Sequence, residues 1–144
     1  MKYQWLPIAA ACLVVVASPH AAQEPAGVKI LVTIPAKVAT FENQRLEVLL
    51  LQTDPRIADK GPMLADRHLD KEFSHAAGKE TRVEIVLGAK AKINPRMQYS
   101  LKVQILDSKT NTPRYIGERD GQPGPVYVLT QGAASKVTMI VRPK

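Results

Sequence analysis

The chain has 144 residues, and its 20 Lys and Arg against 13 Asp and Glu give a formal net charge of +7. This length suits a single domain. The cations are scattered and form no basic run or basic helix, which excludes a typical nucleic-acid-binding protein and leaves only weak, unspecific attraction to acidic partners.

The first 22 residues have the three parts of a secretory signal peptide. Met1-Lys2 is a short positive start, Leu6 to Ala17 is an apolar run, and Ser18-Pro19 breaks that run before small residues follow. A membrane-spanning helix needs about 20 apolar residues, and this run is shorter. We therefore expect cleavage after Ala22 and a periplasmic or secreted protein, with a buried N-terminal helix or a membrane anchor as the alternative.

Cleavage there removes the chain's one cysteine and one tryptophan, Cys12 and Trp5. The apolar run before Cys12 is too short for a lipoprotein signal, so we expect no lipid anchor at this cysteine. Residues 23–27 then form a polar linker, and residues 28–144 form a domain without a disulfide or a thiolate. Such a domain is held together by hydrophobic burial alone, which is feasible for roughly 120 residues.

After Gly27, short segments of alternating apolar and polar residues predict β-strands. The expected strands cover residues 28–34, 44–53, 64–73, 81–87, 99–106, 114–117, 126–129 and 136–141. Segment 64–73 alternates least cleanly and predicts an amphipathic edge strand, with a short helix as the alternative. No connection contains an amphipathic helix for a parallel crossover. The sequence therefore predicts an all-β fold, a small antiparallel β-sandwich of seven to eight short strands, with a small barrel as the alternative.

Two features are candidate interaction surfaces. Strand 44–53 carries Leu49 and Leu51 on the face opposite its expected core residues, which indicates a covered face or a packed partner. The Pro- and Gly-rich loop of residues 120–125, with Gln122 and Pro123 at its centre, is expected to be rigid and exposed. Sheet faces and edges are places where protein partners bind, so we expect an envelope protein of unknown identity as the partner.

The segment from Asn94 to Tyr99 predicts a closed corner. Pro95 fixes its own φ angle, and Asn94 can bond its own backbone, so the pair favours a turn. Tyr99 begins the best alternating strand, and its hydroxyl can reach back to the turn while its ring enters the core. We expect Asn94, Pro95 and Tyr99 to have a structural role.

Two segments resemble motifs of the YbaY / YscW-type family of envelope proteins, which includes type III secretion pilotins. Residues 91–99 read Ala-Lys-Ile-Asn-Pro-Arg-Met-Gln-Tyr, similar to an Ile-Asp-Pro-Arg-x-x-Tyr turn, with Asn94 in place of the usual Asp. Residues 125–132 read Pro-Val-Tyr-Val-Leu-Thr-Gln-Gly, similar to a Val-Leu-Thr-x-Gly turn. The resemblance implies a β-sandwich without catalytic residues and, for the pilotin members, help in assembling an outer-membrane secretin. Many members are lipoproteins, and this chain differs in lacking a lipid-acceptor cysteine.

His68 and His75 are the two histidines beyond the leader. On a strand, Asp66, His68, Asp70 and Glu72 would share a face, which suggests an alternative hypothesis of a small metal-binding or hydrolytic protein. Neighbours on one face of a strand are about 7 Å apart, too far for most of them to reach one ion. A solvated edge face that discourages aggregation is the expected interpretation.

We therefore expect no enzyme, no metal and no cofactor, since no serine lies in a Gly-x-Ser-x-Gly motif either. The expected function is that of a non-catalytic exported envelope protein that binds or helps to assemble another component. Membrane contact is expected to be peripheral at most. Weak binding of anionic lipid or glycan is a third hypothesis.

Overall fold

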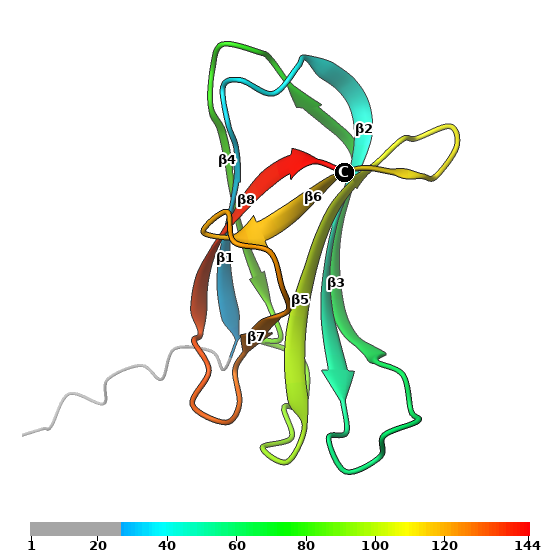
Figure 1. Ribbon diagram of the computed structural model, residues 1–144, viewed down its shortest axis with the longest axis vertical. Helices are drawn as coiled ribbons and strands as arrows, with labels where there is room; N and C mark the ends of the chain where they lie inside the picture. Colours follow the sequence, from blue (N-terminus) through cyan, green and yellow to red (C-terminus); the bar gives the residue numbers. More distant parts are fainter. Residues whose placement is uncertain (1–26) are drawn as a thin grey trace, which may run out of the picture.

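The computed structural model describes residues 27–144, which form eight β-strands and no helix. The strands are β1 (Val28–Ile34), β2 (Phe41–Thr53), β3 (Met63–His75), β4 (Thr81–Leu87), β5 (Gln98–Leu106), β6 (Pro113–Arg119), β7 (Val126–Val128) and β8 (Lys136–Pro143) (Figure 1). The predicted all-β fold is therefore confirmed, and segment 64–73 is a strand and not a helix. The expected signal peptide and residues 23–26 of the expected linker lie outside the described residues. No membrane-spanning helix is found within residues 27–144.

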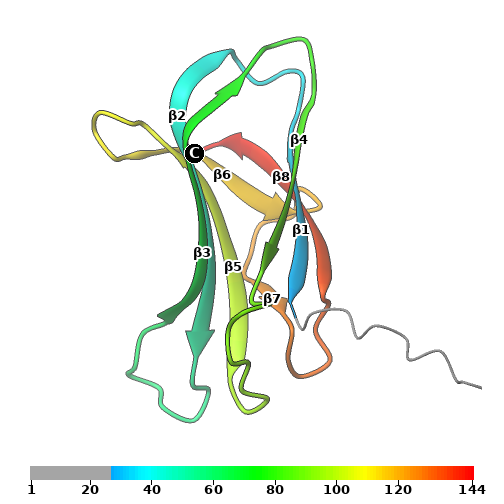
Figure 2. The ribbon, with the colours of Figure 1, turned by 180° about the vertical axis from the view of Figure 1, so that it is seen from behind.

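The strands form one sheet in the order β3-β2-β5-β6-β8-β1-β4, and β7 pairs with β5 beside this path. The sheet bends into a nearly closed, barrel-like shape, so that β3, β2 and β5 face β8, β1 and β4 (Figures 1 and 2). The expectation of purely antiparallel pairing is wrong for one pair, because β1 and β8 run parallel. A parallel pair needs a long connection, and most of the domain lies between these two strands, so no crossover helix is required.

Alternation of side chains builds the core between the two halves of the sheet. In β1 the four side chains of Val28, Ile30, Val32 and Ile34 are all at most 1% exposed. The same two-residue period buries alternate residues of β2, β5 and β8. Burying such a side chain is worth about 1.5–3 kcal/mol, so this core is the main source of stability.

A bulge in β3 changes which side chains face the core. Gln44 pairs with Phe73 and Leu46 pairs with Asp70, so between these pairs two residues of β3 stand opposite one of β2. Phe73 is thereby buried, 6.0 Å from the ring of Phe41. The prediction that Glu72 continues the face of Asp70 is corrected, because the extra residue interrupts the alternation and leaves Glu72 exposed.

Strands β3 and β4 are the two ends of the sheet, and within residues 27–144 no backbone ladder joins them. This confirms β3 as an edge strand. Side chains close the gap instead. The His75 ring bonds the Thr81 hydroxyl at 2.8 Å, and the Asp66 carboxylate accepts a 2.7 Å hydrogen bond from the Gly88 amide.

Candidate interaction surface

The outer face of β2 carries Leu49 and Leu51, both half-buried, while the alternate residues Leu46, Val48 and Leu50 are completely buried. The residues around the two leucines come from the neighbouring strands β3 and β5. In register, Leu49 lies between Arg67 of β3 and Lys102 of β5, and Leu51 lies beside Leu64 of β3. We call Leu49, Leu51 and Leu64 the outer leucine surface.

Further exposed apolar side chains lie near this surface at one end of the sheet, although Met63, the register partner of Gln52, points to the opposite face of β3 from Leu64. Leu64 is 54% exposed, Met63 53% and Ile57 47%, and all three belong to β3 or to the β2–β3 connection. Single exposed apolar residues are common in proteins, but contiguous ones mark interaction sites more often. The outer leucine surface is therefore the best candidate for a docking face on this domain.

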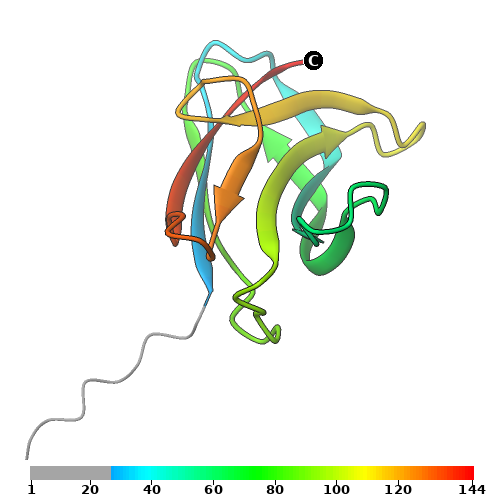
Figure 3. The same cartoon turned by 60° about the horizontal axis from the view of Figure 1, so that its bottom comes forward.

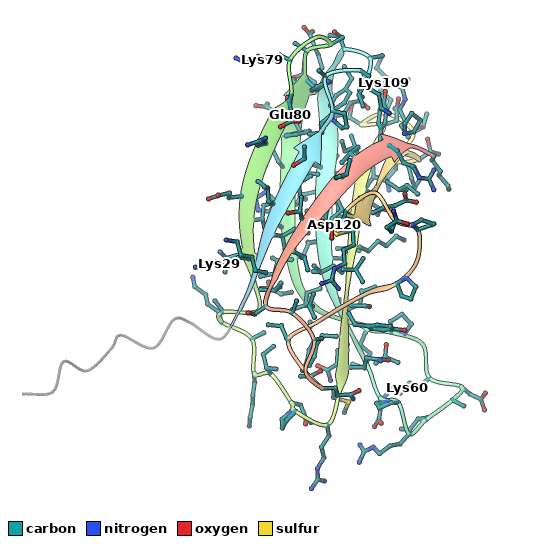
Figure 4. The ribbon with its side chains drawn as sticks, turned by 60° about the vertical axis from the view of Figure 1, so that its left-hand side comes forward. Lys29, Lys60, Lys79, Glu80, Lys109 and Asp120 are labelled. Atoms are coloured by element: carbon teal, nitrogen blue, oxygen red, sulfur yellow. The ribbon has the colours of Figure 1, made fainter. Side chains whose placement is uncertain are left out.

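The loop of residues 120–125 is exposed, as its composition predicts, and Gln122 and Pro123 lie on its outside. It is held by main-chain contacts: the Gln122 amide donates to the Arg119 carbonyl at 2.8 Å, and the Asp120 amide donates to the Thr138 carbonyl at 3.1 Å. The loop thus lies beside β8 (Figure 4). Because β5 and β6 separate β8 from β2 in the sheet, the structure does not bring Gln122 and Pro123 next to the outer leucine surface.

Tyr99 lies at the corner that the sequence indicated, with its side chain fully buried. Its hydroxyl accepts a 2.9 Å hydrogen bond from the Asn94 amide and donates a 3.2 Å bond to Oε1 of Gln52. The Asn94 side chain in turn accepts the Arg96 amide at 3.0 Å, while Pro95 is exposed. Sequence reasoning missed Gln52, whose signal was a polar residue in the inward-facing register of β2, where it needs a partner.

The two motifs that resemble the YbaY / YscW-type family meet in space. Oγ1 of Thr130, a side chain only 8% exposed, donates a 2.6 Å hydrogen bond to the Met97 carbonyl. The preceding residue, Leu129, has a φ of 69°, which an L side chain adopts only when its surroundings hold it. The β4–β5 connection and the β7–β8 turn therefore form one fixed end of the sheet.

His68 is half-buried and lies opposite Val48 of β2, whereas His75 is held by side-chain hydrogen bonds. His75 is 3% exposed, and its second ring nitrogen lies 3.2 Å from the Val38 carbonyl, so both ring nitrogens have partners. Asp66 is engaged with Gly88, as described above. Among residues 27–144 no group of three or more His, Cys, Asp or Glu side chains is arranged to hold a metal ion. The geometry thus gives the metal hypothesis around His68 and His75 no support.

Three carboxylates have a pKa below the ordinary value, and in each case the cause is a hydrogen-bonding partner nearby. A side-chain hydrogen bond from Arg56 lowers the pKa of Asp54 to about 2, and one from Arg142 lowers the pKa of Glu118. Backbone amides of Thr110 and Lys109 lower the pKa of Asp107. All three carboxylates are stabilised in their charged form, Asp54 and Glu118 by an arginine and Asp107 mainly by backbone amides, and these are structural interactions.

No family model matches the chain, and no curated protein sequence matches it. One solved structure does match: an alternative pilotin from the type II secretion system of Vibrio cholerae. The TM-score is 0.50 and the identity 12%, and the match covers 82% of this chain and 97% of that chain. At this identity the similarity concerns the fold alone. The similarity supports a pilotin-like fold, but it does not show that the chain belongs to the YbaY / YscW-type family. The β-domain described above is thus similar in fold to a secretion-system pilotin.

Proposed function

We propose that this protein is a non-catalytic envelope protein whose β-domain binds, or helps to assemble, another envelope component. The observation that carries the proposal is the fold similarity to a pilotin, which extends over 97% of that chain. The motifs resembling YbaY / YscW-type proteins agree with it. Their residues Tyr99 and Thr130 hold the backbone of the corner, which is a structural role and not a chemical one.

The outer leucine surface is the proposed docking face. Its apolar centre at Leu49 and Leu51 is flanked in register by the cations Arg67 and Lys102. An apolar strip with basic neighbours suits a partner segment that combines apolar side chains with carboxylates, since such partners gain both burial and charge complementarity. The proposed location is the periplasm or the outside of the cell, in line with the signal peptide expected in residues 1–22.

The test is co-purification of tagged protein from envelope extracts, comparing wild type with the double variant Leu49→Lys/Leu51→Lys. Leu31→Lys is the matched control, because Leu31 is also a half-buried leucine on the outer side of the sheet, but in β1. We expect a specific envelope protein to be retained by wild type and by the control, and to be lost with the double variant. Equal retention by all three proteins would exclude this face as the docking site.

A further inference from the structure

One end of the molecule carries a set of exposed cations that neither the fold nor the outer leucine surface explains. Lys90, Lys92 and Arg96 all lie in residues 88–97, the β4–β5 connection, which contains no carboxylate. Lys60, on the β2–β3 connection, lies at the same end (Figure 4). We call these four side chains, all exposed, the basic end.

Within residues 27–144, no carboxylate lies within 4.0 Å of the charged nitrogens of the basic end. The acidic groups nearby have other roles or lie beside Lys60. Asp54 is paired with Arg56 at 2.8 Å, Asp66 accepts the Gly88 amide, and Asp59 precedes Lys60 in the chain. The β2–β3 connection is therefore neutral, and the β4–β5 connection supplies the excess positive charge.

Exposed apolar side chains lie at this same end. Ile57, Met63 and Leu64 are three of the five large apolar residues that the described chain exposes. The β2–β3, β4–β5 and β7–β8 connections all lie at this end, which is the bottom of the molecule in Figure 1 and is brought forward in Figure 3. Cations and apolar groups are thus both exposed at the same end of the sheet.

The opposite end differs in its charge. Lys79 and Glu80 are neighbours in the β3–β4 connection, and Lys109 follows Asp107 in the β5–β6 connection (Figure 4). Lys37 in the β1–β2 connection adds one cation there. Positive charge without nearby carboxylates is therefore concentrated at the end that also exposes apolar side chains.

We propose that the basic end docks on the surface of a bilayer that contains anionic lipid. Lys90, Lys92 and Arg96 would contact lipid phosphates, while Ile57 and Met63, which are not part of the outer leucine surface, would enter the interfacial layer. Attraction of cations to anionic headgroups and burial of a few apolar groups are the two contributions that peripheral membrane binding combines. The hydrogen bonds of Tyr99 and Thr130 fix the backbone of the cationic connection beforehand, so less conformational entropy is lost on docking.

Two features favour a lipid surface over a soluble polyanion. A polyanion needs only the cations, whereas here apolar side chains accompany them at the same end. Three of the cations, Lys90, Lys92 and Arg96, also lie on one short connection that projects from the end of the sheet (Figure 3), where a flat surface can approach it. This inference does not rest on the proposed function, because it requires no protein partner.

The experiment measures binding of the purified processed protein to vesicles of phosphatidylethanolamine and phosphatidylglycerol by co-sedimentation, with phosphatidylcholine vesicles as the neutral comparison. The test variant is Lys90→Gln/Lys92→Gln/Arg96→Gln. The matched control, Lys37→Gln/Lys79→Gln/Lys109→Gln, removes the same charge from the opposite end. A second variant, Ile57→Gln/Met63→Gln, removes the apolar contribution, and dextran sulfate replaces the vesicles in a parallel titration. Circular dichroism checks that every variant is folded.

We expect the test variant to bind anionic vesicles at least about tenfold more weakly than wild type, and the control to change binding by less than about twofold. We expect the apolar variant to lose affinity for vesicles and to keep its affinity for dextran sulfate. Equal losses for the test and control variants would overturn the proposal, because they would reflect net charge alone. If the apolar variant bound vesicles as well as wild type does, the proposal would be overturned in favour of unspecific polyanion binding. Equal binding of wild type to neutral and anionic vesicles would also overturn it, because the contact would then be apolar alone.

Discussion

Oγ1 of Thr130 donates a 2.6 Å hydrogen bond to the main-chain carbonyl of Met97, across 33 residues of sequence. This contact joins the β7–β8 turn to the β4–β5 connection. The same connection is held a second time by the Tyr99 hydroxyl, which accepts a hydrogen bond from the Asn94 amide. The two most distinctive segments of the sequence therefore form a single corner. Its backbone is fixed by buried side chains, and it presents exposed cations outward.

Thr130→Val tests the joint between these segments. Valine has nearly the shape of threonine but donates no hydrogen bond, so the carbonyl of the half-buried Met97 loses the Thr130 hydroxyl as a partner. We expect the free energy of unfolding to fall by about 1–2 kcal/mol, measured by urea denaturation. Thr130→Ser, which keeps the hydroxyl, is the control and should retain most of the stability. A valine variant as stable as the serine variant would show that the bond contributes little.

Tyr99→Phe tests the corner itself. The change leaves both the Asn94 amide and the Gln52 side chain without their partner while preserving the buried ring. We expect a loss of about 1 to 2 kcal/mol in the free energy of unfolding, again by denaturation. The same substitution at the 42% exposed Tyr127 of β7 should have no measurable effect. Identical denaturation midpoints for Tyr99→Phe and wild type would refute the corner.

Gly117→Ala tests the closeness of β5 and β6. A Cβ atom at Gly117 would lie 2.7 Å from Cβ of Val103, whose side chain is buried in the core. We expect this overpacking to cost about 1–3 kcal/mol in thermal or urea unfolding. Val103→Ala keeps Cβ but removes Cγ1, which would lie 2.9 Å from the added atom, and should therefore relieve part of the cost in the double variant. Gly61→Ala is the control, because nothing lies within 4 Å of its added Cβ. A stable Gly117→Ala protein would mean that the two strands lie further apart.

The ion pair of Glu118 and Arg142 predicts a pH dependence. Arg142 lowers the pKa of Glu118 in the folded state, so the folded protein binds fewer protons there than the unfolded chain. The pair therefore contributes stability above the ordinary pKa of 4.5, and this contribution disappears as the pH falls through the lowered pKa. We expect Arg142→Gln to raise the pKa of Glu118 in a carboxyl-carbon NMR titration and to flatten the stability profile between about pH 5 and pH 3. Arg119→Gln is the control, and an unchanged Glu118 titration in Arg142→Gln would contradict the pairing.

Local patterns predicted the strands well, because each depends on residues close together in the chain. The bounds expected for 28–34 and 81–87 are those of β1 and β4, whose alternation is regular and whose ends carry Pro35 and Gly88. The bond between Asn94 and Tyr99 is also local, five residues apart, and the turn chemistry indicated it.

Features that depend on distant partners were not predictable in the same way. The bulge that buries Phe73 exists only in relation to the register of β2, and the parallel pairing of β1 with β8 joins the two ends of the domain. Gln52 and Thr130 complete the corner from 47 and 33 residues away. Their polarity indicated that each needs a partner, but nothing near them in the sequence indicated which one.

The most direct test of the proposed function is site-specific photo-crosslinking in living cells, with a photoreactive amino acid at position 49 and, as the comparison, at position 31. Both positions are half-buried leucines on the outer side of the sheet, but they belong to β2 and β1. We predict one discrete adduct with an envelope protein from position 49 and none from position 31. No adduct from position 49, or the same adducts from both positions, would contradict a docking face on the outer side of β2.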